Sequence, residues 1–246
     1  MRQMMIRGMA LVLVGILAGC APLPVAVPAP APSTRPVPVA QPEPVQRLDA
    51  ETAARNFTAV VARMEPVAER ECLARTRNVD CDFLITVDRT PGAPANAFQT
   101  LDRNGRPVIG FTLALIAEAR NQDELAFILG HEAAHHIAGH IPRTQQSAVT
   151  GAMILGTLAS LGGASPEAVR DFERAGATIG ARSYSREFEL EADALGTILA
   201  WRAGYDPERG AEFFSRIPDP GNRFLGTHPP NAQRAEVVRR TVAQLR

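Results

Sequence analysis

Four of the five histidines in this chain of 246 residues fall within eleven positions, GHEAAHHIAGH at 130–140. Residues four apart in an α-helix differ by only about 40° around the helix axis, so His131 and His135 can bind one metal ion together. Glu132 lies about 80° from this pair, where its carboxylate can act as a general base toward a water molecule. The pattern HExxH therefore predicts two metal ligands and a hydrolytic base.

The helix that carries this motif cannot complete the metal site by itself. Measured from the direction midway between the two ligands, His136 lies about 120° away and His140 about 160° away, so neither reaches the ion from a continuous helix. The related pattern HExxHxxGxxH would need glycine at 138 and histidine at 141, where the chain has Ala138 and Ile141. We therefore expect the third ligand from a different segment.

An acidic segment downstream, SREFELEADALGTILAWRAG at 185–204, can supply that ligand. On a helix, Glu189 and Asp193 share one face, which the small residues Gly196 and Ala200 continue. Because small residues let two backbones approach closely, we expect this face to lie against another buried helix. The other two acidic residues of the segment are expected to project into solvent on the far side: Glu187 and Glu191.

Together these residues resemble the HtpX-like and CAAX-prenyl-protease-type zinc metallopeptidases, which are HExxH gluzincins, in a soluble periplasmic lipoprotein branch of that family. The resemblance runs from roughly residue 48 to the end of the chain. It rests on four motifs, NAF at 96–98, HEAAH at 131–135, ELEAD at 189–193 and THPP at 227–230. It implies an α+β fold, a mainly helical zincin-like domain with a small β-sheet and an active-site helix that carries HExxH.

The resemblance also implies one Zn²⁺ per chain and a role for each matching residue. His131, His135 and Glu189 would be the zinc ligands and Glu132 the base. Asp193 would orient a ligating histidine. Further residues belong to the implied substrate and oxyanion sites: Asn96, Ala97, Phe98, His228 and Arg234.

Among these, the strand that bears NAF would bind extended substrate by edge pairing, and Arg234 would also bind substrate. His228 would steady the oxyanion or bind zinc as a removable fourth ligand. It could instead be a loop or capping histidine before Pro229.

These features predict a zinc-dependent endopeptidase that hydrolyses unfolded or misassembled proteins of the bacterial cell envelope. Two alternatives stay open. One is a zinc-binding lipoprotein without catalytic activity that acts as a chaperone or assembly factor, and the other is a structural envelope protein without metal. The 26 basic and 26 acidic residues cancel, so charge gives no indication of nucleic-acid binding.

The start of the chain is typical of a bacterial lipoprotein. Residues 1–19 combine two arginines with a short apolar run, and LAGC at 17–20 resembles a lipobox. Cys20 would become the lipidated first residue of the mature chain, and Ala21 favours sorting to the periplasmic face of the outer membrane. An ordinary secretory signal with an incidental cysteine is the alternative.

A Pro-rich stretch follows the lipobox. Nine of the twenty prolines lie between 21 and 45, a composition typical of an extended, semi-rigid spacer, although it could also bind a partner. The sequence thus divides into a signal peptide at 1–19, a lipidated cysteine and tether at 20–47, and a metallopeptidase domain at 48–246.

The domain begins with a helical pattern at 49–75 that Pro66 could break or kink. Cys72 and Cys81 form a disulfide or remain two buried thiols. Short strands are expected at 81–87, 95–101 and 106–112. DRNG at 102–105 is the expected hairpin turn between the last two.

The remaining chain is helical. Asn121 with Glu124 resembles a capping box that opens the histidine helix, and Ile141-Pro142 would end it. The apolar stretch 151–163 is interpreted as a core helix, with a mobile lid or a surface touching lipid or substrate as alternatives. Later helices are expected to start at Asp206-Pro207 and near Asn231.

Overall fold

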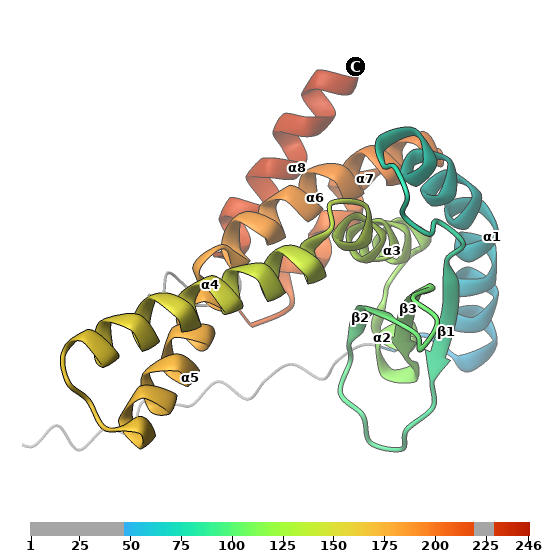
Figure 1. Cartoon of the computed structure of the whole chain (residues 1–246). Coiled ribbons are helices and arrows are strands. Elements are labelled where there is room, and N and C mark those ends of the chain that lie inside the picture. Colours follow the sequence, from blue (N-terminus) through green and yellow to red (C-terminus); the bar gives the residue numbers. More distant parts are fainter. Residues whose placement is uncertain (1–46, 219–228) are drawn as a thin grey trace, which may run out of the picture. The chain divides into compact units, whose positions relative to one another are not determined.

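The structure, a computed structural model, describes residues 47–218 and 229–246, which belong to one compact unit, Pro44–Arg246. The expected signal peptide, Cys20, most of the tether and His228 lie outside the described residues. The described part is mostly helical with one small sheet, which confirms the expected α+β class (Figure 1). Its elements are α1 (Ala50–Arg75), β1 (Leu84–Asp88), β2 (Ala97–Leu101), β3 (Pro107–Thr112), α2 (Leu113–Glu118), α3 (Gln122–Ile137), α4 (His140–Leu161), α5 (Pro166–Ser183), α6 (Ser185–Arg202), α7 (Pro207–Gly210), the 3₁₀-helix η1 (Ala211–Ser215) and α8 (Asn231–Leu245).

The three strands and the turn expected from the sequence are confirmed, with ends shifted by a few residues. The strand order is β1-β3-β2, with β1 parallel and β2 antiparallel to the central β3. In the β2–β3 turn, the Asp102 N–H donates to the Arg106 carbonyl at 2.9 Å, and Gly105 takes a φ of 87° that suits a residue without a Cβ. Because β3 is the central strand, β2 lies at one edge of the sheet.

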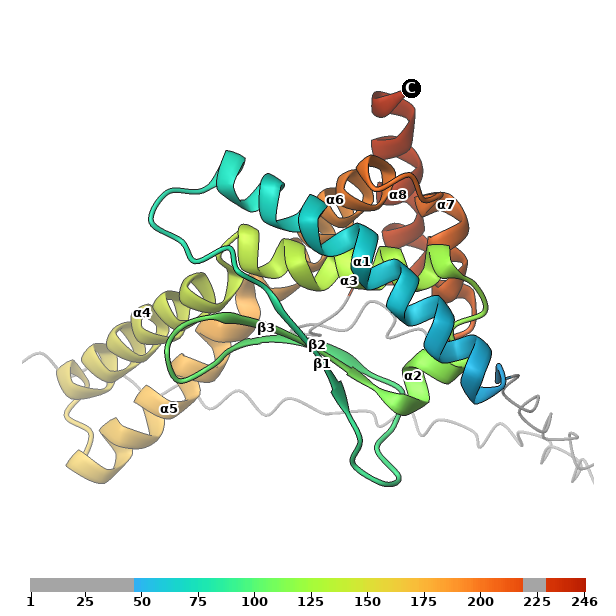
Figure 2. The same ribbon diagram turned by 90° about the vertical axis from the view of Figure 1, so that its right-hand side faces the viewer.

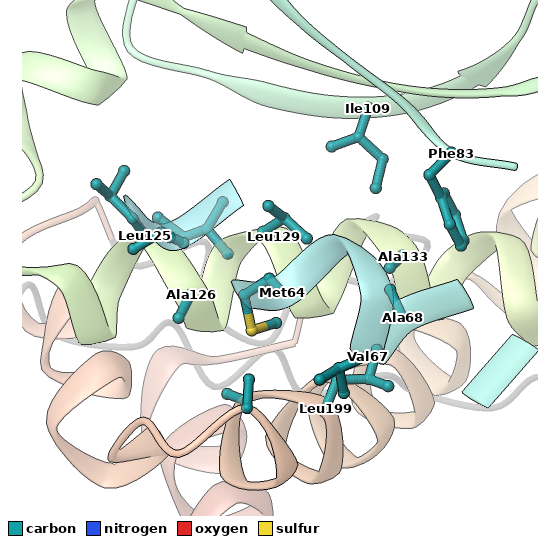
Figure 3. Packing of buried hydrophobic residues seen from close by; sticks show 14 of the residues in the cluster. Met64, Val67, Ala68, Phe83, Ile109, Leu125, Ala126, Leu129, Ala133 and Leu199 are labelled. Atoms are coloured by element: carbon teal, nitrogen blue, oxygen red, sulfur yellow. The ribbon is translucent and has the colours of Figure 1, made fainter. Parts of the chain in front are cut away.

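Helix α3 lies between the sheet and α6 and packs against α1 (Figures 2 and 3). Figure 3 shows Ile109 of β3 on one side of α3 and Leu199 of α6 on the other, with Leu129 of α3 between them. The helix begins where the capping box predicts, because the Asn121 side chain accepts a hydrogen bond from the Glu124 N–H at 3.0 Å. The Glu124 carboxylate accepts from the Arg120 N–H at 2.9 Å and not from that of Asn121, so only half of the box is formed. Packing on opposite sides holds this helix, and with it the HExxH motif, in one position.

Helix α1 runs without interruption through Pro66, so the expected helix is confirmed and the break is not observed. Its last turn is tied to the segment before β1 by a disulfide between Cys72 and Cys81, both of which are buried. The bridge fixes the end of the long helix against the start of the sheet.

The end of α3 differs from the prediction. The helix stops at Ile137, and Gly139 takes a left-handed φ of 66° before α4 begins at His140. Pro142 does not end a helix but lies in the first turn of α4, where no intrahelical N–H donor is needed. Glycine adopts the left-handed conformation at no steric cost, so the helix ends at Ile137, four residues before the expected end at Ile141.

The interpretation of 151–163 as a core helix is wrong. Helices α4 and α5 form a hairpin whose backbones touch, since a Cβ added at Gly151 would lie 2.1 Å from the Gly176 carbonyl oxygen. Contact with α5 covers one side of α4, and only His140 and Gly156 of this helix are buried. Large apolar side chains on the hairpin are more than a third exposed: Val149, Met153, Ile154, Leu158, Leu161, Phe172 and Ile179.

None of the helices in the described part of the chain is both long and apolar enough to cross a bilayer.

Exchanging both Ile154 and Leu158 for glutamine should change the free energy of unfolding by no more than about 0.5 kcal/mol, because both side chains already face water. Leu129→Ala, a control in the core, should lose about 2–5 kcal/mol through the cavity it leaves. Urea unfolding measures both. A loss of about 2 kcal/mol or more in the glutamine variant would contradict the exposure of this helix face.

Candidate active site

The site is built where α3 crosses α6 with almost no space between the two backbones. A Cβ added at Gly196 would lie 2.7 Å from the His131 backbone nitrogen, and one added at Gly130 would lie 2.7 Å from the Gly196 carbonyl oxygen. The small-residue face expected on the acidic helix is therefore the face that meets α3. This contact lies next to the first histidine of HExxH and less than one turn beyond Asp193.

Three potential metal ligands converge at this crossing. The Nε2 atoms of His131 and His135 are 3.0 Å apart, and each lies 3.5 Å from a carboxylate oxygen of Glu189. Ligands bound tetrahedrally at about 2.0–2.2 Å from Zn²⁺ lie about 3.3–3.6 Å from one another. The donor types and their spacing fit a single divalent ion, and within the described residues these three form a group that could hold one.

His131 is held in place by Asp193 and Arg234, which lie behind it. Its Nδ1 lies 2.9 Å from Asp193 Oδ1, which leaves Nε2 directed at the other two donors. Asp193 is fully buried, and Arg234 of α8 donates to both of its oxygens, at 2.8 and 2.7 Å. Burial alone would raise the pKa of Asp193, but hydrogen bonds from Arg234 and His131 hold it below its usual value.

This pairing gives Arg234 a role that the sequence did not predict. Its side chain lines the cleft but is only 10% exposed, and both Nε and Nη2 donate to Asp193. A carboxylate buried as deeply as Asp193 needs a cation beside it, so the guanidinium supports the ligand side chains, and the expected contact of Arg234 with substrate stays a prediction.

The electrostatics favour a single positive charge between the two imidazoles. Burial disfavours a proton on His131, but hydrogen bonds to Asp193 and Glu189 outweigh burial and raise its pKa to about 10. Burial and the adjacent His131 lower the pKa of His135 to about 3. The two rings cannot both be imidazolium cations at this separation, and a divalent ion bound between them would supply the positive charge that the carboxylates favour.

Glu132 faces a cleft of about 1000 Å³ whose lining includes His131, His135 and Glu189. Burial raises the pKa of the Glu132 carboxyl group, and the nearby Glu189 carboxylate adds to the increase. A half-buried carboxylate that lines the cleft beside a metal-binding group is placed to act as a general base.

The NAF segment lies along the same cleft. Ala97 and Phe98 belong to the edge strand β2, and all three residues of the segment line the cleft. Asn96 precedes the strand and exchanges hydrogen bonds with Thr112, whose hydroxyl accepts from the Asn96 N–H at 2.9 Å. The Phe98 ring covers Gly110 of β3, where an added Cβ would meet it at 2.3 Å. The edge strand thus borders the proposed ligands and can face a second extended chain.

Two histidines outside the ligand pair take different positions. His136 points away from the ligands, and its Nε2 lies 2.6 Å from the Asp80 carbonyl oxygen. His140 points toward the ligands: its Nδ1 lies 2.8 Å from His135 Nδ1, and only 4% of the residue is exposed. Within the described residues, the group that could hold a metal is His131, His135 and Glu189, so the prediction that His140 is not a ligand stands. The turn at Gly139 nevertheless brings His140 against His135, a contact that a continuous helix would not allow.

Both acidic residues expected on the far side of α6 are exposed, and one of them also has partners near the site. Glu187 is exposed, as predicted. Glu191 is about half exposed but pairs with Arg143 at 2.8 Å and with His140 at 3.2 Å, so it belongs to the surroundings of the site. Gly139 was the one signal in the sequence that could have revealed both contacts, since glycine commonly ends helices.

An HExxH helix whose two histidines meet a glutamate from a second helix defines a metallopeptidase of the gluzincin class. The sequence profile of peptidase family M48 matches residues 59–242 of this chain. The chain therefore belongs to that family, which confirms the class expected from the motifs.

Relatives with known names share part of this sequence. The chain is 33% identical over 124 residues to a Vibrio cholerae protein provisionally named beta-barrel assembly-enhancing protease, covering 47% of this chain and 25% of that protein. It is 29% identical over 146 residues to the beta-barrel assembly-enhancing protease of Escherichia coli, a match that covers 54% of this chain and 30% of that protein. It is 27% identical over 135 residues to the mitochondrial metalloendopeptidase OMA1 of Arabidopsis thaliana, a match that covers 53% of this chain and 27% of that protein. The matched segment thus spans less than a third of each relative.

Gly196→Ala should separate α3 from α6, because the new methyl group would overlap the His131 backbone. We expect a loss of about 1–3 kcal/mol in stability and weaker binding of Zn²⁺, measured by urea unfolding and by competition with a chelating dye. Gly162→Ala is the matched control, since its methyl group would meet other atoms only at 3.4 Å. Equal zinc affinity in the two variants would contradict the role of the close crossing.

Proposed function

We propose that this chain is a zinc-dependent endopeptidase of the bacterial cell envelope that hydrolyses peptide bonds in unfolded or misassembled envelope proteins. The observation that carries the proposal is the donor set of His131, His135 and Glu189, whose atoms lie 3.0–3.5 Å apart in the same cleft as the half-buried carboxylate of Glu132. These residues would hold one Zn²⁺ per chain.

When bound, Zn²⁺ supplies Lewis-acid chemistry that polarises a peptide carbonyl and makes water more acidic. Glu132 would take the proton of the attacking water and return it to the leaving amine. Asp193, clamped by Arg234, would keep the His131 ring oriented through its Nδ1. We assign His228, by its position in the THPP motif, to the oxyanion of the substrate or to a removable fourth ligand position.

The substrate class follows from the edge strand at the cleft. A polypeptide that adds to β2 must itself be extended, so folded proteins would be excluded and unfolded segments accepted. Because main-chain hydrogen bonds supply most of the affinity in this mode, many sequences would be cleaved. The printed names of the Vibrio and Escherichia relatives refer to β-barrel assembly, which supports envelope proteins as the substrates.

Glu132→Gln should lower cleavage of unfolded casein by about 10²–10⁴-fold while zinc stays bound, because glutamine cannot accept the proton. A chelator should abolish cleavage by the wild type, and added Zn²⁺ should restore it. Glu187→Gln, which removes an exposed carboxylate from α6, is the control and should cleave at the wild-type rate.

Each result of this experiment separates one function from another. Cleavage retained in Glu132→Gln would refute the role of Glu132. A wild-type protein that contains zinc but cleaves nothing would favour the chaperone or assembly factor. A wild-type protein that binds no zinc would refute the metallopeptidase proposal altogether.

We further propose that Cys20 carries the lipid that anchors the chain to the periplasmic face of the outer membrane. Residues 1–19 would be removed, residues 20–47 would serve as the tether, and residues 48–246 would form the peptidase domain. The support is the lipobox-like LAGC at 17–20 and the proline content that follows it.

Cys20→Ala should abolish incorporation of a labelled fatty acid and release the protein from the membrane fraction, because no thiol remains for acylation. Ala21→Asp is the control: it should keep the label while shifting the protein toward the inner membrane. Labelling that persists in Cys20→Ala would place the anchor elsewhere.

A further inference from the structure

We infer that His140 is a positioning residue for the metal site: with Glu191 it forms a hydrogen-bond relay that fixes the proton and the ring orientation of the ligand His135. The inference rests on the proposed zinc site. Its geometric basis is the contact between His140 Nδ1 and His135 Nδ1 at 2.8 Å and the contact between His140 Nε2 and Glu191 Oε2 at 3.2 Å.

Only one arrangement of protons satisfies these contacts when a metal is bound. His135 directs Nε2 toward the other donors, so this nitrogen must offer a lone pair to the ion and the ring proton must lie on Nδ1. That N–H donates to Nδ1 of His140, which must therefore carry its own proton on Nε2. This second N–H donates to the carboxylate of Glu191.

The two ligating histidines are thus oriented in parallel ways. His131 is held through its Nδ1 by the carboxylate of Asp193, and His135 is held through its Nδ1 by His140, which is held in turn by a carboxylate. Metal-bound histidines generally donate their second N–H to such a partner, and loss of that partner typically weakens metal binding by about 10–100-fold.

The surroundings keep His140 in this position. Its ring stacks on Phe188 with centroids 4.5 Å apart and an interplanar angle of 9°. Arg143, one turn along α4, lies over the same Phe188 ring at 4.2 Å and donates to Glu191 at 2.8 Å. Phe188 and Glu191 flank the ligand Glu189 on α6, so the start of α4 docks on the turn that supplies the third ligand.

The test compares zinc affinities by competition with a chelating dye. His140→Phe keeps an aromatic ring against Phe188 but removes the acceptor, so we expect zinc to bind about 10–100-fold more weakly. His140→Asn places an amide oxygen near the Nδ1 position and should recover part of this loss. His136→Asn, on the neighbouring helix α3 but pointing away from the ligands, should bind zinc as tightly as the wild type.

A second measurement separates positioning from a general structural role. Protease activity of His140→Phe should return toward the wild-type kcat when Zn²⁺ exceeds its weakened Kd, because the residue acts through the ion. Thermal unfolding in excess chelator should show whether the variant folds, and if it does not, His140→Asn and Glu191→Ala carry the comparison, with a smaller loss expected for Glu191→Ala.

The outcomes distinguish this inference from the proposed function. If the wild type binds zinc and cleaves casein while His140→Phe binds zinc equally well, the relay has no positioning role and the endopeptidase stands. Equal affinity for wild type, His140→Asn and Glu191→Ala would overturn the relay in the same way. If the wild type itself binds no zinc, the metal site fails before the relay is in question.

Discussion

The backbone contact between α3 and α6 at Gly130 and Gly196 is the constraint on which the site depends. Two imidazoles come from one helix and two carboxylates from the other, and their short reach requires the helix axes to approach closely. A Cβ at either glycine would lie 2.7 Å from the facing backbone, so any side chain there would force the two helices apart. The sheet packs on the side of α3 opposite α6, and α1 packs against both helices, so the core holds this one distance (Figure 3).

Beside that crossing, the protein buries an unusual density of charge. Asp193 is fully enclosed, and His131 and Arg234 are almost so. Taking ions out of water costs several kcal/mol each, and even well-paired buried charges rarely add to net stability. The buried charged residues instead contribute by fixing the orientation of the ligand side chains. In a medium of low polarity a bidentate guanidinium–carboxylate pair is strong and directional, so it can hold one imidazole at a fixed angle.

The left-handed backbone of Gly139 has two consequences that are hard to separate. It rotates His140 back toward His135, and it sends the rest of α4 away from the core, where among the described elements it packs mainly against α5. Helix α4 carries no charged residue after Arg143, yet most of its large apolar side chains meet solvent. An apolar composition therefore does not imply burial when the chain leaves the core at a single residue.

Local patterns in the sequence determined the helices, the strands, the capping box and the facing pairs His131/His135 and Glu189/Asp193, because helical and strand periodicities are properties of neighbouring residues. The motif resemblance supplied the family and the ligand roles. Three matters were decided only by the tertiary structure: the pairing of Arg234 with Asp193, the approach of His140 to His135, and the exposure of α4. Each depends on contacts between segments far apart in the chain or on one backbone angle at Gly139, and neither leaves a periodic trace in the sequence.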